Sequence, residues 1–457
     1  MGHPHDRRFR RSAVRLLTPV RSAPWLDPTM AELVQRYLDQ LVAEYAPVGD
    51  GALADYIPEL TTVDPTGFGL TISSSDGFLY ESGDARTEFT IQSISKPFTY
   101  ALALDRVGQQ AVDAKIGVEP SGDAFNEISV DEHTKIPKNP MINAGAIAAV
   151  SLVPGATPDE RFAQIRDFYS ACAGRPLEID EDVYRSEKAT GSRNRAIAYM
   201  LTSFGVLDEP DDVLDVYFRQ CSLRVTSVDL ARMAATLARG GINPQTGRRV
   251  TGAPVVQRTL SVMVTCGMYN GAGDWVSAVG MPAKSGVGGG IAAVLPGQLG
   301  IGVYSPLLDG RGNSVRGVLV CRALSERLGL HFLTVGRESR ATIRAVYEPR
   351  PGVRVYELHG DLMFAGAEKA LRTVDRDCGE FAVGVFDVTR VDTINDPARE
   401  LLAGMSTTLR AAGKQGYVVD PDSAVVRPDR GFDDVVFRTL DDAVAAAGEW
   451  LRDNQSR

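Results

Sequence analysis

The sequence predicts two domains: an α+β sandwich of an antiparallel sheet and a helical block, then a small α/β domain. In the larger, N-terminal part of the chain, strand patterns flank a long helical middle, so strands distant in sequence must share one sheet. After about residue 354, strands and helices alternate regularly, as in α/β folds. At 457 residues the chain also exceeds what one hydrophobic core usually organises.

The first domain is expected to open with a helix and a hairpin. Apolar residues recur at three- and four-residue spacing from Met30 onward, and Thr29 with Glu32 forms a capping box. Between Gly67 and Tyr80 the alternating strings GFGLTI and FLY flank a Ser75-Asp76-Gly77 turn, which predicts a β-hairpin.

Helices are expected from about residue 96 to 265, and their ends are marked in the sequence. Thr157-Pro158-Asp159-Glu160 starts one helix that Gly174 ends, and the Thr226–Asp229 segment starts another that Gly240 and Gly241 end. Strands resume with GGGIAAVL and LGIGVYS around a Pro296-Gly297 turn, and a helix follows around VLVCRALSERLG.

The expected boundaries are a basic tail over 1–29, the first domain over 30–336, a linker over 337–354 and the second domain over 355–457. The tail contains RRFRRSAVRLLTPVR but lacks the apolar region and cleavage site of a secretory signal. We interpret it as a disordered tail or a misassigned start upstream of Met30; an organelle transit peptide is the alternative. Pro349, Pro351 and Gly352 indicate the linker.

The second domain is expected to follow a βαβαβα order. Its strands are VRVYEL, FAVGVFDV and GYVVD, and its helices are AGAEKALRTV, PARELLAGMSTTLRAA and LDDAVAAAGEWLR.

Composition excludes several classes of protein. A net charge of −9 argues against a nucleic-acid surface. Five cysteines never form a CxxC pair, so neither a disulfide framework nor a zinc site is predicted, and a reducing compartment is expected. No window of about 20 apolar residues indicates a membrane span. No cofactor is expected.

A nucleophile and its base are predicted in the string FTIQSISKPF. Pro97 is tolerated only in the first turn of a helix, so a helix is expected to begin near Ser93. Residues i and i+3 share a helix face, so the Ser93 hydroxyl and the Lys96 amine can meet. A desolvated lysine with a lowered pKa can accept the proton of such a hydroxyl. The S-x-x-K spacing alone is common by chance.

A second element, Lys284-Ser285-Gly286 followed by Val287 and three glycines, makes the pair more specific. S-x-x-K with a late K-[ST]-G strand is the arrangement of the serine β-lactamase and penicillin-binding superfamily. In that arrangement the glycine-lined strand lets substrate approach the backbone and supplies an N–H to the oxyanion.

Longer sequence strings, over about residues 50 to 325, point to one family within this superfamily. These strings are DYIPEL, IQSISKPF, NPMINAGAI, SEKATGSRN, YFRQCS, CGMYNGAG and PAKSGVGGG, in this order. Together they resemble the serine-dependent glutaminase family, whose fold is β-lactamase-like. The resemblance implies hydrolysis of L-glutamine to L-glutamate and ammonia in the cytoplasm, by a homodimer or homotetramer.

The resemblance also implies roles for particular residues. Ser93 would be the nucleophile, Lys96 its base, and the N–H groups of Ser93 and Val287 the oxyanion hole. Tyr269 would be a proton relay or hydrogen-bonding partner beside Ser93. The residues expected to line the pocket or hold the amino-acid end of glutamine are Tyr56, Asn143, Glu187, Asn194 and Tyr217.

Residue chemistry agrees with this division of roles. Glutamine carries an ammonium and a carboxylate on one carbon, so a selective site needs an anion for the former and uncharged donors for the latter. Lys284 is open to three roles: catalytic, electrostatic, or orienting Tyr269. Each residue taken alone also has a structural interpretation, such as a solvated Glu187 or a core Tyr217.

The C-terminal domain resembles the STAS fold of anti-sigma-factor antagonists and sulfate-transporter tails, on the string FDVTRVDTINDPARELL. In the antagonists a hydroxyl at this turn is a phosphorylation switch. Here Asp396 stands in its place, so a fixed negative charge at a helix N-terminus is expected instead. A protein partner, dimerisation and a nucleotide or other small molecule all remain open for this domain.

Two alternatives are a related enzyme and a protein of a different functional class. A β-lactamase or DD-peptidase would use the same Ser-Lys pair, but the chain lacks an SDN triplet and its predicted pocket suits a zwitterion. A regulatory protein with a degenerate enzyme domain is disfavoured, because the candidate site residues are intact: Ser93, Lys96, Lys284, Tyr269 and Glu187.

Overall fold

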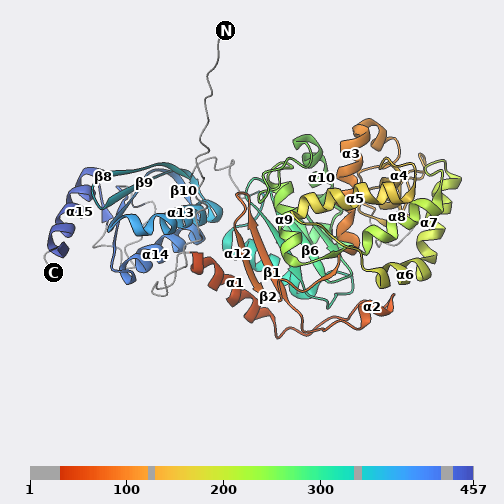
Figure 1. Ribbon diagram of the computed structural model, residues 1–457, viewed down its shortest axis with the longest axis horizontal. Coiled ribbons are helices and arrows are strands. Elements are labelled where there is room, and N and C mark those ends of the chain that lie inside the picture. The colour runs from red at the N-terminus through yellow and green to blue at the C-terminus, as the bar shows by residue number, and fades with distance from the viewer. Residues whose placement is uncertain (1–30, 122–128, 334–341, 422, 424–435, 456–457) are drawn as a thin grey trace, which may run out of the picture.

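Two bodies of secondary structure lie side by side in the computed structural model (Figure 1), which describes residues 31–121, 129–333, 342–421, 423 and 436–455. The helices are α1 (Ala31–Tyr45), α2 (Pro58–Thr61), η1 (Gln92–Ile94), α3 (Ser95–Asp113), α4 (Asn143–Ser151), α5 (Pro158–Ala173), α6 (Glu181–Thr190), α7 (Ser192–Ser203), α8 (Pro210–Cys221), α9 (Ser227–Ala238), α10 (Ala253–Cys266), η2 (Tyr269–Gly271), α11 (Ala272–Ala278), α12 (Val315–Leu328), α13 (Phe364–Asp377), η3 (Cys378–Glu380), α14 (Asp396–Ala411) and α15 (Leu440–Gln455). The strands are β1 (Gly69–Ser74), β2 (Leu79–Gly83), β3 (Phe89–Thr90), β4 (Arg224–Val225), β5 (Ala283–Gly286), β6 (Gly290–Leu295), β7 (Leu299–Tyr304), β8 (Ile343–Arg350), β9 (Val353–Leu362), β10 (Val383–Ile394), β11 (Gln415–Val419) and β12 (Val436–Phe437).

The first body contains a five-stranded antiparallel sheet of order β2-β1-β7-β6-β5. Its strands come from both sides of the helical middle, and Ile72 of β1 pairs with Ile301 of β7. Both predicted hairpins are present, as β1–β2 and β6–β7. The prediction that sequence-distant strands share one sheet is confirmed.

Strand β7 explains how helices cover both faces of this sheet. Its alternating large residues, Ile301 and Val303, are buried in one cluster with residues of α1 and α12. Its glycines face α9: a Cβ on Gly300 would lie 2.2 Å from the Ala235 backbone nitrogen, and one on Gly302 would lie 2.0 Å from the Ser227 carbonyl oxygen. Helix α9 therefore rests directly on strand backbone.

The predicted helix caps are present in the helical block. The Thr157 side chain accepts a hydrogen bond from the Glu160 backbone N–H, and Gly174 ends α5 in the left-handed conformation. Thr226 and Asp229 form a reciprocal capping box at α9, as expected. Helix α1 confirms the first predicted helix, whereas its expected cap at Thr29 and the basic tail over 1–29 lie outside the described residues.

The second body is a five-stranded sheet of order β12-β11-β10-β9-β8. Strands β9 to β12 are parallel, with α13 and α14 on one face and α15 on the other. The linker predicted over 337–354 is wrong for Ile343–Arg350, which form β8 and pair antiparallel with β9 around the Pro351-Gly352 turn. Residues 334–341 of the intervening segment lie outside the described residues.

Helix α13 joins the two bodies by packing against the β1–β2 hairpin. Arg372 pairs with the buried Glu368 and with Asp76 at 2.8 Å, and its guanidinium lies 4.9 Å from the Phe78 ring centroid. The Tyr80 hydroxyl also donates to Glu368. Phe364 is 3% exposed and belongs to the same apolar cluster as α1 and α12. The contact is therefore both apolar and ionic.

Across the described ranges, every helix is too short or too polar to cross a lipid bilayer.

Replacing Arg372 with alanine should lower the free energy of unfolding by about 3 kcal/mol, because it leaves the Glu368 carboxylate buried without its cation. Urea denaturation would measure this change. Arg376→Ala is the matched control, since Arg376 is 74% exposed and makes only a surface pair with Asp377 at 3.3 Å. The control should shift stability by less than about 0.5 kcal/mol. Equal losses in the two variants would contradict the interface described here.

Candidate active site

Ser93 lies in a short 3₁₀ turn, η1, that directly precedes α3. The helix proper begins at Ser95, two residues later than the position near Ser93 predicted from Pro97. Gln92, just before the nucleophile, has φ of +48°, a strained value for a residue with a side chain. Such strain persists where the surrounding structure imposes it, and it gathers at functional sites.

Glycines of the β5–β6 hairpin, Gly288 in its turn and Gly290 at the start of β6, hold the Ser93 turn in place from one side. A Cβ on Gly288 would lie 2.6 Å from the Thr90 carbonyl oxygen, and one on Gly290 would lie 2.7 Å from both Ile94 and Phe89 side-chain atoms. The sequence suggested that these glycines make room for substrate. In the structure, Gly288 and Gly290 make room for the chain segment that carries Ser93.

A two-stranded ribbon holds the same turn from the other side. β3 pairs with β4, and the Ile91 N–H donates to the Leu223 carbonyl at 2.8 Å. Leu223 follows α8, whose last turns carry Tyr217 and Cys221. The ribbon therefore fixes the nucleophile turn relative to helix α8.

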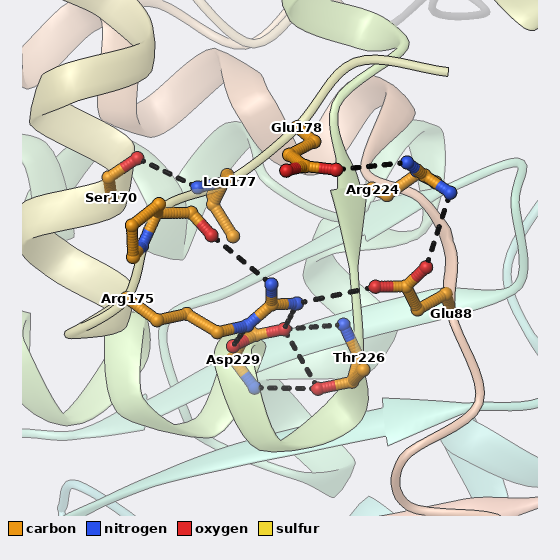
Figure 2. A network of polar contacts seen from close by, with 9 residues as sticks. Glu88, Ser170, Arg175, Leu177, Glu178, Arg224, Thr226 and Asp229 are labelled. Carbon is orange, nitrogen blue, oxygen red and sulfur yellow. Dashed lines mark hydrogen bonds and ion pairs between the residues drawn. The ribbon is translucent and has the colours of Figure 1, made fainter.

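A polar network closes the outer end of this ribbon (Figure 2). Arg175 forms a bidentate pair with Asp229 at 2.8 and 2.6 Å, and Asp229 is only 1% exposed. Glu88 lies 3.8 Å from Arg175 and 3.5 Å from Arg224, so it links the α9 cap to strand β4. The exposed pairs contribute little individually, whereas the buried Asp229 pair anchors the network.

A cavity of about 230 Å³ opens beside Ser93. It is lined by Tyr56, Gln92, Ser93, Asn143, Glu187, Thr190, Gly191, Arg193, Asn194, Tyr217, Cys221 and Val287. This set contains most of the site residues predicted from sequence. Lys96, Tyr269 and Lys284 do not line this cavity and are buried.

Glu187 supplies the carboxylate of this cavity. It is 7% exposed, and burial raises its pKa, while hydrogen bonds from Gln92 and Tyr56 act in the opposite direction. The Tyr56 hydroxyl lies 3.2 Å from the Glu187 carboxylate and 3.0 Å from the Gln92 side-chain oxygen. Although Tyr56 is 43% exposed, its hydroxyl is turned toward the cavity. A buried carboxylate of this kind suits a cationic group of a ligand.

Lys96 is joined to the cavity by a chain of side chains. It is fully buried, its Nζ donates to Asn143 Oδ1 at 2.7 Å, and Asn143 Nδ2 donates to Asn194 Oδ1 at 2.9 Å. Burial lowers the pKa of Lys96 to about 8. A lysine near this value can act as a base close to neutral pH.

Tyr269 and Lys284 lie together behind Ser93. The Tyr269 hydroxyl donates to the Ser285 carbonyl at 3.0 Å, and burial raises its pKa while the neighbouring Ser93 hydroxyl lowers it by less. Lys284 Nζ lies 4.0 Å from the Tyr269 ring centroid and donates to the same carbonyl at 2.6 Å. Burial and the nearby Lys96 lower the Lys284 pKa well below its usual range.

Sequence reasoning missed five cavity residues: Gln92, Thr190, Gly191, Arg193 and Cys221. Gln92 lies in the quoted string IQSISKPF, beside Ser93. Thr190, Gly191 and Arg193 lie in SEKATGSRN, between or beside the chosen Glu187 and Asn194. Cys221 lies four residues after Tyr217, on the same face of α8, which helical spacing could have revealed. In the described ranges, no group of three or more His, Cys, Asp or Glu side chains is placed to hold a metal ion.

Comparison with known proteins gives a consistent result. The family model named Glutaminase matches residues 51–333. The glutaminase of Microcystis aeruginosa is 50% identical over 307 residues, which cover 67% of this chain and 91% of the relative. The glutaminase of Corynebacterium glutamicum is 43% identical over 405 residues, covering 88% of this chain and 97% of the relative. Glutaminase 1 of Bradyrhizobium diazoefficiens is 47% identical, but the chain spans only 61% of its length.

Solved structures agree. The crystal structure of Mglu in its glutamate form has a TM-score of 0.66 and 40% identity, and the match covers 85% of this chain and 98% of that one. The probable glutaminase ybaS has a TM-score of 0.64 and 42% identity, with 66% of this chain and 98% of that chain covered.

Gly288→Ala should destabilise the protein by about 1–3 kcal/mol, because the added methyl group would press on the Thr90 carbonyl. Urea denaturation would measure the loss. Gly49→Ala is the control, since a Cβ there meets nothing within 4 Å. An unchanged stability in Gly288→Ala would show that the contact between strand and turn can relax.

Proposed function

Because this chain belongs to the glutaminase family, we propose that it hydrolyses L-glutamine to L-glutamate and ammonia through an acyl-enzyme on Ser93. One observation carries the proposal: a single cavity holds Ser93 and the buried Glu187, and Asn143 links that cavity to a lysine whose pKa is about 8. A nucleophile, a base and an anion for an ammonium group are therefore assembled around one small space.

The amino-acid end of glutamine would bind in the cavity of about 230 Å³. Glu187 would receive the α-ammonium group, with the Tyr56 hydroxyl beside it. Asn143, Asn194 and Tyr217 would contact the α-carboxylate as uncharged polar groups, and Arg193 adds a positive charge to the same wall. Bound substrate would then leave little uncompensated charge inside the protein.

In the first step, Ser93 Oγ would attack the side-chain amide carbon while Lys96 Nζ takes its proton. The hydrogen bond to Asn143 Oδ1 holds the Lys96 amine in place. Negative charge on the carbonyl oxygen would be stabilised by the N–H groups of Ser93 and Val287, and a donor of this kind typically contributes about 10²–10³ in rate. Ammonia leaves after protonation, and water then hydrolyses the ester with Lys96 again as base.

Tyr269 would carry protons between Ser93, Lys96 and the leaving nitrogen. Its pKa is raised, so the hydroxyl is protonated at neutral pH and would relay a proton by accepting one on its oxygen while passing on its own. Among the roles left open for Lys284, we favour orienting Tyr269. Its amine lies over the tyrosine ring, and both side chains donate to the Ser285 carbonyl.

For the second domain we propose a STAS-like fold, and we propose that the turn between β10 and α14 is the part of this domain that docks. Asn395 caps α14 through the Ala398 N–H and also donates to the Leu328 carbonyl at the end of α12. Asp396 pairs with Arg399 at 2.5 Å, so this turn already carries a compensated charge rather than a phosphorylatable hydroxyl. We further propose a cytoplasmic homo-oligomer, in keeping with a free amino acid as substrate and with the free cysteines of the described residues.

Ser93→Ala should lower the release of ammonia and glutamate from L-glutamine by at least about 10³-fold without unfolding the protein, because the acyl-enzyme cannot form. The purified protein would be given L-glutamine, L-asparagine, D-glutamine and a chromogenic cephalosporin, with the variant alongside. Turnover of cephalosporin instead of L-glutamine would move the assignment to a β-lactamase. No turnover of any of the four would refute the enzymatic proposal.

The rate should also depend on pH through Lys96. Its pKa is about 8, below the ordinary value for lysine, so the unprotonated base becomes available as pH rises through that value. We therefore expect kcat/KM to rise roughly tenfold between pH 7 and pH 9, measured by initial rates in constant ionic strength. Lys96→Arg, which stays protonated, should be inactive across the range. A flat profile for the unmodified protein would exclude Lys96 as the base.

A further inference from the structure

A second cavity, of about 490 Å³, lies against Tyr269. It is formed by the end of α10, by η2 and α11, and by the loop that precedes α4. Its apolar residues include Met141, Ile142, Val264, Ala272 and Val276, and Cys266 also lines it. Among the described residues of its wall, none carries a charged side chain.

The two cavities share no lining residue, but neighbouring residues line them. Asn139, Met141 and Ile142 line the second cavity, and the next residue, Asn143, lines the first. Tyr269 lines the second cavity while its hydroxyl neighbours Ser93, which lines the first. The nucleophile and Tyr269 therefore stand between the two spaces.

We infer that the second cavity receives an alkyl substituent on the leaving nitrogen, so that γ-L-glutamyl-N-alkylamides are substrates alongside L-glutamine. The inference rests on the proposed function. With the α-carbon end held by Glu187 and the amide carbon at Ser93, the leaving nitrogen faces its proton donor, Tyr269. A substituent on that nitrogen would extend past Tyr269 into a space whose described lining is largely apolar.

The reaction balances as an ordinary acyl transfer. Ser93 Oγ forms a bond to the amide carbon, its proton passes to Lys96, and the C–N bond breaks. The leaving nitrogen gains a proton relayed through Tyr269 and departs as the primary amine. Water then adds to the ester carbon, Ser93 regains its proton, and L-glutamate is released.

The alkyl chain should improve turnover by burial alone. Each buried methylene group contributes a factor of about four to kcat/KM if the transition state gains its full transfer free energy. A series of γ-L-glutamyl methyl-, ethyl-, propyl- and butylamides would therefore show kcat/KM rising with chain length in the unmodified protein, with L-glutamine turnover measured in the same preparation. A steep fall in kcat/KM from the methylamide to the butylamide would overturn the inference. This test uses only the unmodified protein.

Gly273→Leu tests the location of the binding site. Gly273 lines the second cavity, and a Cβ there meets nothing within 4 Å, so the leucine side chain can occupy the cavity. We expect kcat/KM for the butylamide to fall by about tenfold or more while that for L-glutamine stays within about twofold. Gly379→Leu, at another glycine with open space but in the second domain, is the matched control and should leave both values unchanged.

The outcomes separate the two proposals. Equal losses for both substrates in Gly273→Leu would overturn the cavity assignment while the glutaminase proposal stands. Absence of L-glutamine turnover in the unmodified protein would overturn the proposed function and the inference together.

Discussion

The site depends on the close approach of the nucleophile turn to Gly288 and Gly290 of the β5–β6 hairpin. Thr90–Ile94 lies so near this strand pair that side chains at 288 and 290 would overlap it. This contact places Ser93 beside Val287, because Ser93 lies in the nucleophile turn and Val287 lies in the turn between β5 and β6 that it touches. It also buries the start of α3, where Lys96 loses its water shell and acquires the pKa of a base.

Burial acts differently on the cationic and the anionic side chains of the site. Lys96 and Lys284 are both fully buried, and each amine is driven toward its neutral form. Glu187 is buried in the lining of the cavity, where hydrogen bonds from Gln92 and Tyr56 partly compensate its charge. Amines whose pKa values are lowered near the nucleophile, and a buried carboxylate in the lining of the same cavity, match a substrate whose reacting amide is neutral and whose other end is charged.

Much of the fold could be predicted because the deciding information is local. The hairpins were predicted from the alternation of apolar and polar residues around short turns. Capping pairs such as Thr226 with Asp229 predicted where helices start. Strand β8 was missed because its residues are mostly exposed, contain Pro349 and show no clean alternation. Its identity comes from pairing with β9, which no local pattern reveals.

The site was predictable to the extent that its residues lie in distinctive strings, and the structure brings Ser93, Asn143, Glu187, Asn194 and Tyr217 to one cavity. The backbone strain at Gln92 and Tyr269, with φ of +48° and +55°, has no sequence signature, because only the folded chain imposes it. The glycine contacts were assigned to substrate for a similar reason: a sequence shows that space is needed, but not which atoms fill it.

The bare contact between α9 and β7 limits how the enzyme could be made more heat-resistant. Replacing glycine with alanine is a common device for stiffening the unfolded chain. Alanine cannot be accommodated at Gly300 or Gly302, since the backbone of helix α9 already occupies the space that a methyl group would need. A protein engineer would have to search the open glycines at the periphery, such as Gly310, and leave the interior of the sandwich untouched.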